Sequence, residues 1–97
     1  MENVKIIIAG PRGRMGREAV HLVDEIENYQ LAAVVDYKHG GKMLSDIEGF
    51  QIPGVPVYET VEECLQSVDA DVLIDLTTPE VGMHHTKTAL LHGVRPV

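Results

Sequence analysis

Short apolar runs alternate along the chain with longer segments in which apolar residues recur at helical spacing. The runs at residues 4–9, 31–35 and 72–76 are rich in Val, Ile, Leu and Ala, and each is followed by a glycine or a polar residue. Runs of this length that end in turn residues predict β-strands buried on both faces.

Three other segments have the features of helices. In residues 14–27 one apolar stripe is formed by Met15, Ala19, Leu22, Val23 and Ile26. Thr60 and Glu63 fit a capping box, which predicts a second helix from there to about residue 68. Thr78 followed by Pro79 predicts the start of a third helix, and Gly93 predicts its end.

Residues 37–56 are rich in residues that favour turns, and this composition predicts a loop. Gly40 and Gly41 lie near its start, and residues 53–56 read Pro-Gly-Val-Pro. We expect at most a short strand near residues 55–58. Pro96 and Val97 would open a further strand.

The resulting order is strand, helix, strand, loop, helix, strand, helix. Strands that alternate with helices imply a parallel sheet with right-handed crossovers and helices on both faces. We therefore predict an α/β fold with a Rossmann-like parallel sheet, truncated before its later strands. The sheet edge left by a missing fifth strand is expected to favour marginal stability or self-association.

Charge and cysteine content narrow the choice of partner and compartment. The 97 residues carry a formal net charge of −7, which argues against nucleic acid or an anionic membrane as the main partner. The first apolar run, which ends at Ala9, is too short for a signal sequence or a membrane span. Cys64 is the only cysteine, so no intrachain disulfide can form and the reducing cytoplasm is the expected setting.

A glycine-rich turn joins the first predicted strand to the first helix, with the sequence Gly10-Pro11-Arg12-Gly13-Arg14-Met15-Gly16. Gly10 permits a tight turn, Gly13 lets backbone amides approach a pyrophosphate, and Gly16 lets the helix pack close to the sheet. Arg12 and Arg14 add two cations to the partial positive charge of the helix N-terminus. The turn predicts a site for a nucleotide cofactor.

Asp36 ends the second strand, 20 residues after Gly16, where a carboxylate would accept hydrogen bonds from adenosine ribose hydroxyls. Taken alone, Asp36 is better explained as a strand-end residue that caps a turn, but beside the glycines it favours dinucleotide binding. A 2′-phosphate would be repelled unless a cation stands close, and Lys38, Lys42 or Arg14 could supply one. We predict the use of NADH, with NADPH tolerated.

Thr77 and Thr78 follow the third strand, at the sheet edge where ligands of open α/β sheets lie. Their spacing fits a helix cap and a cofactor contact about equally, and both interpretations stay open here.

Other reactive side chains are given structural interpretations. His84 and His85 are adjacent on the third helix, so their side chains point about 100° apart and cannot share one ligand direction. We expect partly solvated helix residues there and predict no metal site. Cys64 is expected to be a small buried apolar residue, and Asp24, Glu25 and Glu27 to be a solvated helix end.

The glycine-rich turn also carries a family resemblance. Gly-Pro-Arg-Gly-Arg-Met-Gly after an Ile-rich strand is similar to the Gly-x-x-Gly-Arg-Met-Gly motif of 4-hydroxy-tetrahydrodipicolinate (dihydrodipicolinate) reductases. Asp36, the Gly-rich segment before Leu44 and Asp46, and the run from Asp75 to Glu80 agree with that family. The resemblance covers essentially all 97 residues.

This resemblance implies an enzyme of lysine (diaminopimelate) biosynthesis that reduces a cyclic dihydrodipicolinate-type substrate with hydride from NADH or NADPH. The residues matching Gly10 to Met15 would wrap the cofactor phosphates, and Asp36 would bind the adenosine ribose. Family members that use both cofactors often have Arg after the acid. Tyr37 stands there in this chain, which shifts attention to Lys38 for a 2′-phosphate.

The resemblance further implies that the catalytic residues lie outside this chain. Residues 1–97 are expected to form an incomplete dinucleotide-binding domain, and the C-terminal domain that binds substrate and makes the family homotetrameric is expected to be absent. We therefore expect the 97 residues to bind cofactor without turnover and to contain no catalytic residue. His84 and His85 do not inherit the role of the His-His motif in that domain.

Two other functions remain possible at this point. One is the N-terminal domain of another two-domain NAD(P)-dependent dehydrogenase, of the glucose–fructose oxidoreductase type, which the Arg14-Met15 pair argues against. The other is a nucleotide-sensing module without chemistry.

Overall fold

The computed structural model describes residues 3–97, without the side chains of residues 79–81. A five-stranded parallel sheet has the order β3-β2-β1-β4-β5. Its elements are β1 Val4–Ala9, α1 Arg14–Glu25, β2 Tyr29–Val35, the 3₁₀ turn η1 Leu44–Asp46, β3 Val57–Tyr58, α2 Val61–Ser67, β4 Val72–Asp75, α3 Pro79–Leu91 and β5 Arg95–Pro96. The predicted strands and helices are therefore present, with ends displaced by up to a few residues.

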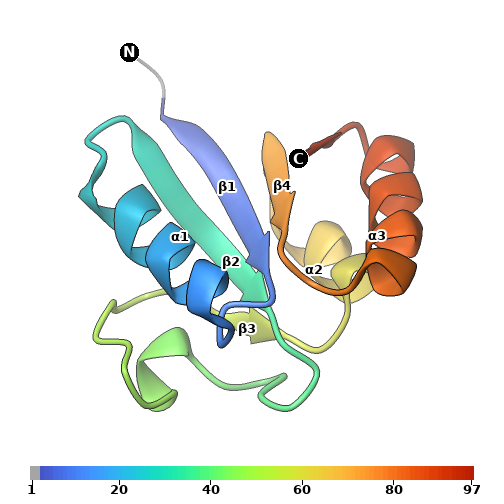
Figure 1. Cartoon of the computed structure of the whole chain (residues 1–97). Helices are drawn as coiled ribbons and strands as arrows, with labels where there is room; N and C mark the ends of the chain where they lie inside the picture. The colour runs from blue at the N-terminus through green and yellow to red at the C-terminus, as the bar shows by residue number, and fades with distance from the viewer. Residues whose placement is uncertain (1–2) are drawn as a thin grey trace.

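Helices cover both faces of the sheet (Figure 1), α1 on one side and α2 with α3 on the other. Successive residues of β1 point to opposite faces, so Ile6 and Ile8 belong to the core under α1, while Ile7 and Ala9 belong to the core under α2 and α3. This explains why β1 is apolar at consecutive positions: both faces of the central strand are buried.

A register shift in β2 decides which of its side chains reach each core. Ile6 pairs with Leu31, but Ile7 pairs with Ala33, so one residue of β2 is bulged out. The shift reverses the alternation, and Leu31 and Val34 consequently lie in the same core.

The apolar stripe predicted for α1 is partly wrong. Met15 and Leu22 are 68% and 58% exposed, whereas Val20 and Val23 are buried together with Gly16. The contact face follows from Gly16, which lies against the preceding turn, and residues four and seven positions later share its face. Because glycine contributes nothing to a hydrophobic stripe, the sequence pattern placed that face incorrectly.

The segment between β2 and β3 is a loop, as predicted, and it also completes the core under α1. Leu44, Ile47, Phe50 and Val55 are all buried there. The loop folds back on itself through backbone bonds from the Leu44 amide to the Val55 carbonyl, at 2.8 Å, and from the Val57 amide to the Lys42 carbonyl, at 2.9 Å. Figure 1 shows this segment at the end of the sheet where β2 stops.

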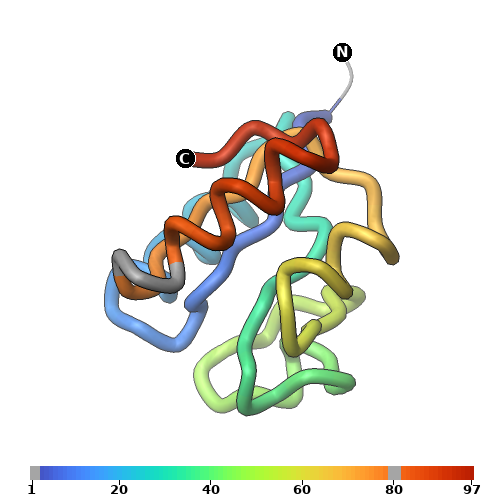
Figure 2. Tube along the Cα trace, turned by 90° about the vertical axis from the view of Figure 1, so that its right-hand side faces the viewer, coloured from blue at the N-terminus to red at the C-terminus, as the bar shows by residue number. Residues whose placement is uncertain are grey.

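The ends of α2 and α3 agree with the predicted helix signals. The Thr60 hydroxyl accepts a hydrogen bond from the Glu63 amide at 3.2 Å. Thr78 is the N-cap of α3, and Gly93 follows the C-cap with a φ of +73°. Figure 2 shows α3 running along the molecule beside β4 and turning back into the last residues.

The expectation of a missing fifth strand is wrong. Arg95 and Pro96 pair with Val72 and Leu73, so β5 is present beside β4 as a two-residue edge strand. β3 at the opposite edge is equally short. Short edges, one of them carrying a proline, offer little backbone for pairing with another sheet. Among the described residues, no helix is long and apolar enough to cross a membrane.

Candidate functional site

The carboxyl ends of β1, β2 and β4 meet at the middle of the sheet, where the chain turns outward to opposite sides. In open parallel sheets this switch point forms a crevice. A cleft of about 750 Å³ opens there between the glycine-rich turn, the end of β2, the start of α2 and the start of α3. The cleft is therefore the candidate site.

Two glycines make the turn after β1 possible. Gly10 has a φ of +84°, and a Cβ there would lie 3.0 Å from the Leu76 carbonyl oxygen. A Cβ on Gly16 would lie 1.9 Å from the Gly10 carbonyl oxygen, which no side chain can tolerate without a backbone shift. Both positions require glycine because the protein's own backbone occupies the space.

Gly13 differs from its two neighbours. A Cβ there would meet only the Gly10 carbonyl oxygen, at an ordinary distance of 4.0 Å. Gly13 is the N-cap of α1, with no side-chain cap and no acidic residue in the first turn. Among the described side chains, none bonds the first amides of α1, at the helix end that carries partial positive charge and binds anions.

Arg12 links this turn to the end of β2. Its Nε and Nη2 donate to the two carboxylate oxygens of Asp36, the second at 3.0 Å, in a bidentate ion pair. The Lys38 amide also donates to Asp36 Oδ1 at 3.0 Å. The Asp36 side chain is 2% exposed, whereas that of Arg12 is 32% exposed.

This pairing keeps Asp36 ionised. Burial by itself raises the pKa of the Asp36 carboxyl, but the hydrogen bonds from Arg12 and from the Lys38 amide outweigh it and hold that pKa below its ordinary value. The hydrogen bond to Asp36 in turn raises the pKa of the Arg12 guanidinium. The cleft therefore presents an ionised carboxylate paired with a charged guanidinium at neutral pH.

Tyr37 lies at the rim, 72% exposed, close to both Arg12 and Lys38. The Arg12 Cζ and the Lys38 Nζ each lie 5.9 Å from the centre of its ring. This distance allows a cation–π interaction with either one. The ring also offers an exposed flat surface beside Asp36.

Asp75 at the end of β4 organises the other side of the cleft. Its Oδ1 accepts hydrogen bonds from the Thr77 amide, at 2.9 Å, and from the Thr77 hydroxyl. Its Oδ2 is 3.1 Å from His85 Nδ1 of α3, and both side chains are about nine-tenths buried. Asp75 thus joins the loop after β4 to α3.

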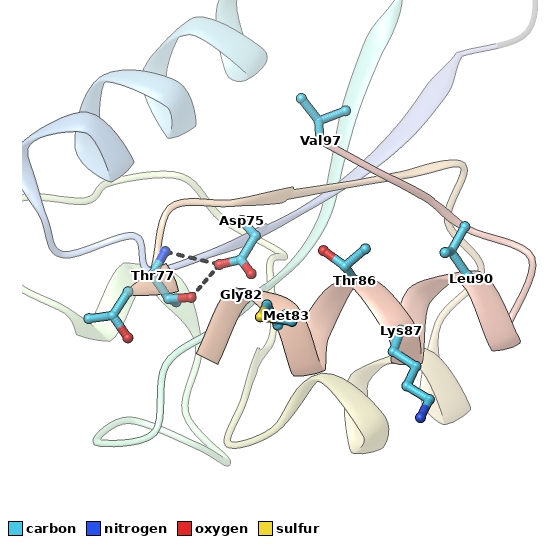
Figure 3. A pocket seen from close by; sticks show the side chains of 9 residues that line it. Asp75, Thr77, Gly82, Met83, Thr86, Lys87, Leu90 and Val97 are labelled. Atoms are coloured by element: carbon cyan, nitrogen blue, oxygen red, sulfur yellow. Dashed lines mark hydrogen bonds between the residues drawn. The ribbon is translucent and has the colours of Figure 1, made fainter. Parts of the chain in front are cut away.

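A second, shallower hollow of about 630 Å³ lies on the other side of this loop. Figure 3 shows the Asp75–Thr77 bonds at one end of this hollow and Val97 and Leu90 at the other. Thr77 and Thr78 line both hollows, whereas Asp75 lines only this second one, so the loop after β4 separates them.

The structure brings most of the predicted site residues together. Seven line the cleft: Gly10, Arg12, Gly13, Asp36, Tyr37, Thr77 and Thr78. The other five lie around it, with Pro11 and Gly16 buried in the turn and Arg14, Met15 and Lys38 exposed. Thr78 is the backbone cap of α3 without a side-chain cap bond, so its hydroxyl is not used by the helix.

The sequence did not predict the residues that line the cleft opposite the glycine-rich turn. Glu59, Glu62, His84 and His85 line the cleft from the start of α2 and from α3. Glu62 Oε1 lies 2.8 Å from His84 Nε2, which links the two helices. Capping features were visible at residue 60, but nothing local indicated that α2 and α3 face the same cleft.

The interpretation of His85 as a partly solvated residue is wrong. His85 is 8% exposed and bonded to Asp75, because the first turns of α3 lie on the end of β4. His84 is exposed, as expected. Within the part of the chain that the structure describes, no group of three or more His, Cys, Asp or Glu could hold a metal ion.

Cys64 is fully buried in the core under α2 and α3, which confirms its interpretation as a small apolar residue. Burial raises the pKa of its thiol to about 12, with a smaller contribution from Glu63, so it is not a nucleophile at neutral pH.

The residues present fit a dinucleotide. A Cβ on Gly13 would meet no described side-chain atom within 4 Å, which leaves room for a diphosphate at the start of α1. Asp36 supplies a buried, ionised acceptor at the end of the next strand. The sheet order, the turn and the acid together define a Rossmann-like domain of the dinucleotide-binding class.

Comparison with known proteins identifies the family. Residues 4–97 match the family model described as dihydrodipicolinate reductase, N-terminus, and the chain belongs to this family. It is 54% identical over 97 residues to the 4-hydroxy-tetrahydrodipicolinate reductase of Bacillus cytotoxicus and 53% identical to that of Bacillus cereus. The matched region is 100% of this chain but 36% of each relative, so the chain spans about a third of the length of these relatives.

Solved structures agree with this assignment. A dipicolinate-bound dihydrodipicolinate reductase from Paenisporosarcina sp. TG-14 superposes with a TM-score of 0.81 at 42% identity, over 97% of this chain and 36% of that one. A scyllo-inositol dehydrogenase from Lactobacillus casei with bound NAD(H) has a TM-score of 0.72 at 20% identity, over 98% of this chain and 27% of that one. The second likeness shows a shared fold only, so the alternative of another dehydrogenase type is not favoured.

Proposed function

We propose that this chain is the cofactor-binding part of a reductase of lysine (diaminopimelate) biosynthesis. The whole protein would transfer hydride from NADH or NADPH to a cyclic dihydrodipicolinate-type substrate. The observation that carries this proposal is the cleft in which Gly13, the uncapped start of α1 and Asp36 converge, in a chain that belongs to the dihydrodipicolinate reductase family.

Each part of the cleft has a role in holding the dinucleotide. The amides at the start of α1 would hold the diphosphate, with Arg14 nearby as a further cation. Asp36 would accept from the adenosine ribose, with Tyr37 beside it. Thr77 and Thr78, on the loop that Asp75 holds, would lie toward the nicotinamide end. When bound, the reduced nicotinamide supplies the hydride.

The described residues act on the cofactor and not on the substrate. They bind the diphosphate, orient the adenosine and hold the loop after β4, and we propose no catalytic residue among them. The 97 residues alone would then bind NADH without turnover. Assembly of the whole protein as a homotetramer and its activity in the cytoplasm are further parts of this proposal, the latter supported by the buried, unpaired Cys64.

Calorimetric titration of the 97-residue chain with NADH tests the proposal. We expect saturable binding with one site and, in a separate assay with the reductase substrate, no oxidation of NADH. A folded sample that gives no heat at millimolar nucleotide would overturn cofactor binding. Turnover by these residues alone would overturn the assignment of chemistry to the rest of the protein.

Two variants refine the site. Arg14→Ala should weaken NADH and NADPH alike because the diphosphate is common to both. Asp36→Ala should weaken NADH about tenfold, the value of one or two charge-assisted hydrogen bonds, but should not weaken NADPH. Equal losses of both cofactors in Asp36→Ala would count against the ribose assignment.

A further inference from the structure

The Arg12–Asp36 ion pair is asymmetric in a way that matters for ligand binding. Asp36 lies on a strand end, is almost fully buried, and is also held by the Lys38 amide at 3.0 Å. Arg12 reaches it from a turn, through a long side chain that is about a third exposed to the cleft. The carboxylate is therefore the fixed half of the pair, and the guanidinium is the half that can turn to another acceptor.

Asp36 keeps some acceptor capacity while it is paired. A carboxylate offers about four lone-pair positions, and Arg12 and the Lys38 amide occupy three of them. The position that remains suits one ribose hydroxyl. A dinucleotide without a 2′-phosphate can consequently bind beside the intact pair.

A 2′-phosphate meets a different balance of charge. It would bring between one and two further negative charges toward Asp36, in a cleft that Glu59 and Glu62 also line. Among the described residues that line the cleft, Arg12 is the only Lys or Arg. Lys38 directs its ammonium over the exposed ring of Tyr37 at the rim.

We propose that Arg12 decides whether this cleft accepts a dinucleotide that carries a 2′-phosphate on the adenosine ribose. The inference rests on the proposed function and deepens it. With such a ligand, the Arg12 guanidinium moves its two hydrogen bonds from the Asp36 carboxylate to the 2′-phosphate, whose oxygens can accept both bonds in the same geometry. Binding of NADPH then depends on Arg12, and binding of NADH depends on Asp36.

Calorimetry of the 97-residue chain at one fixed ionic strength tests this inference, with NADH and NADPH as one pair of ligands. A second pair, 5′-AMP and 2′,5′-ADP, isolates the 2′-phosphate from the nicotinamide. Arg12→Ala should raise the Kd for NADPH and for 2′,5′-ADP at least about tenfold, and should change the Kd for NADH and 5′-AMP by less than about threefold.

Arg14→Ala is the matched control, because it removes the same charge from the same turn but has no contact with Asp36 among the described ion pairs and hydrogen bonds. It should weaken NADH and NADPH by similar factors. Lys38→Ala should change the ratio of the Kd for NADPH to the Kd for NADH by less than Arg12→Ala changes it. A larger shift with Lys38→Ala would overturn the inference.

Arg12→Lys keeps the test decisive if Arg12→Ala leaves Asp36 buried without a partner and fails to fold. Lysine retains the charge but cannot donate two parallel hydrogen bonds. The Kd for NADPH should therefore rise relative to the Kd for NADH by more than about threefold. Equal changes in both cofactors for the Arg12 variants would overturn the inference alone. Absence of binding by the folded wild-type chain would overturn the proposed function and this inference with it.

Discussion

Gly13 and Gly16 lie one helical turn apart, yet the atoms around them place different demands on them. A Cβ on Gly16 would stand 1.9 Å from the Gly10 carbonyl oxygen, whereas a Cβ on Gly13 would stand 4.0 Å from that same oxygen. The requirement for glycine at residue 16 thus comes from the fold, and the requirement at residue 13 comes from the proposed ligand.

This contrast gives a paired prediction for Gly13→Ala and Gly16→Ala. Gly16→Ala should destabilise the chain by about 3 kcal/mol or more, because a backbone shift is needed to relieve the overlap. Gly13→Ala should change the free energy of unfolding by less than about 1 kcal/mol, because alanine is the poorer N-cap but also restricts the unfolded chain. It should weaken the binding of NADH about tenfold or more. Urea unfolding measures the change in stability, and calorimetry measures the change in the Kd for NADH. A Gly16→Ala variant as stable as wild type, with unchanged NADH binding, would contradict the prediction.

The Arg12–Asp36 pair gives a pH-dependent contribution to stability. Burial raises the pKa of Asp36, the Arg12 and Lys38 donors lower it more, and the net value in the folded chain lies below the ordinary 3.8. The folded state therefore holds the proton less tightly than the unfolded state. The stabilisation is complete above pH 3.8 and is lost as the pH falls through the lower folded value.

Asp36→Asn should accordingly be about 1–2 kcal/mol less stable than wild type at pH 7, and this difference should shrink below pH 4. Urea unfolding between pH 7 and pH 3 measures it. Asp24→Asn, which changes an exposed carboxyl in α1, is the control and should stay within about 0.5 kcal/mol of wild type throughout. A difference that grows toward acid would show that Arg12 does not stabilise the ionised form.

At the scale of elements, α2 depends strongly on Thr60, the residue that caps its N-terminus. It has only seven residues, Val61–Ser67, and packs one side on the sheet through Val61 and Cys64. So short a helix has little intrinsic stability, and its cap and its buried face must hold it. The Thr60 hydroxyl bond to the Glu63 amide is one of these two supports.

Thr60→Ala should therefore cost about 1 kcal/mol, and Thr60→Ser should cost less than half of that because serine keeps the capping hydroxyl. Thermal and urea unfolding of the three chains compare them. Equal losses in the two variants would assign the effect to the methyl group of Thr60 and not to the cap.

For the whole molecule, two cores share one sheet. Leu44 of the loop lies in the core under α1, and Leu73 of β4 lies in the core under α2 and α3; both are fully buried. Since β1 contributes alternate residues to both cores, disruption of one should loosen the other. The chain should unfold as one cooperative unit.

Leu44→Ala and Leu73→Ala should each lower stability by about 2–4 kcal/mol while the single transition is retained. Leu91→Ala, at a position that is 79% exposed on α3, should change it by less than about 0.5 kcal/mol. Circular dichroism during heating and denaturant titration follow all three. Two separate transitions in either core variant would show that the cores unfold independently.

The sequence by itself determined the order of strands and helices, the glycine-rich turn, the acid after the second strand and the family. These are local features: apolar runs, caps and turn residues act within a few positions of one another. Residues 4–9 and Thr60 are examples, because the chemistry that defines each element is contained within it.

Only the tertiary structure decided which faces and side chains meet. The buried face of α1 follows from Gly16 against Gly10, and the pairing of Arg12 with Asp36 joins positions 24 residues apart. His85 is buried because α3 lies on β4, and Leu44 because its loop folds back under α1. Each of these features depends on segments that are far apart in the sequence and close in space. The periodicity of the sequence reports only on neighbouring positions, so it does not predict such contacts.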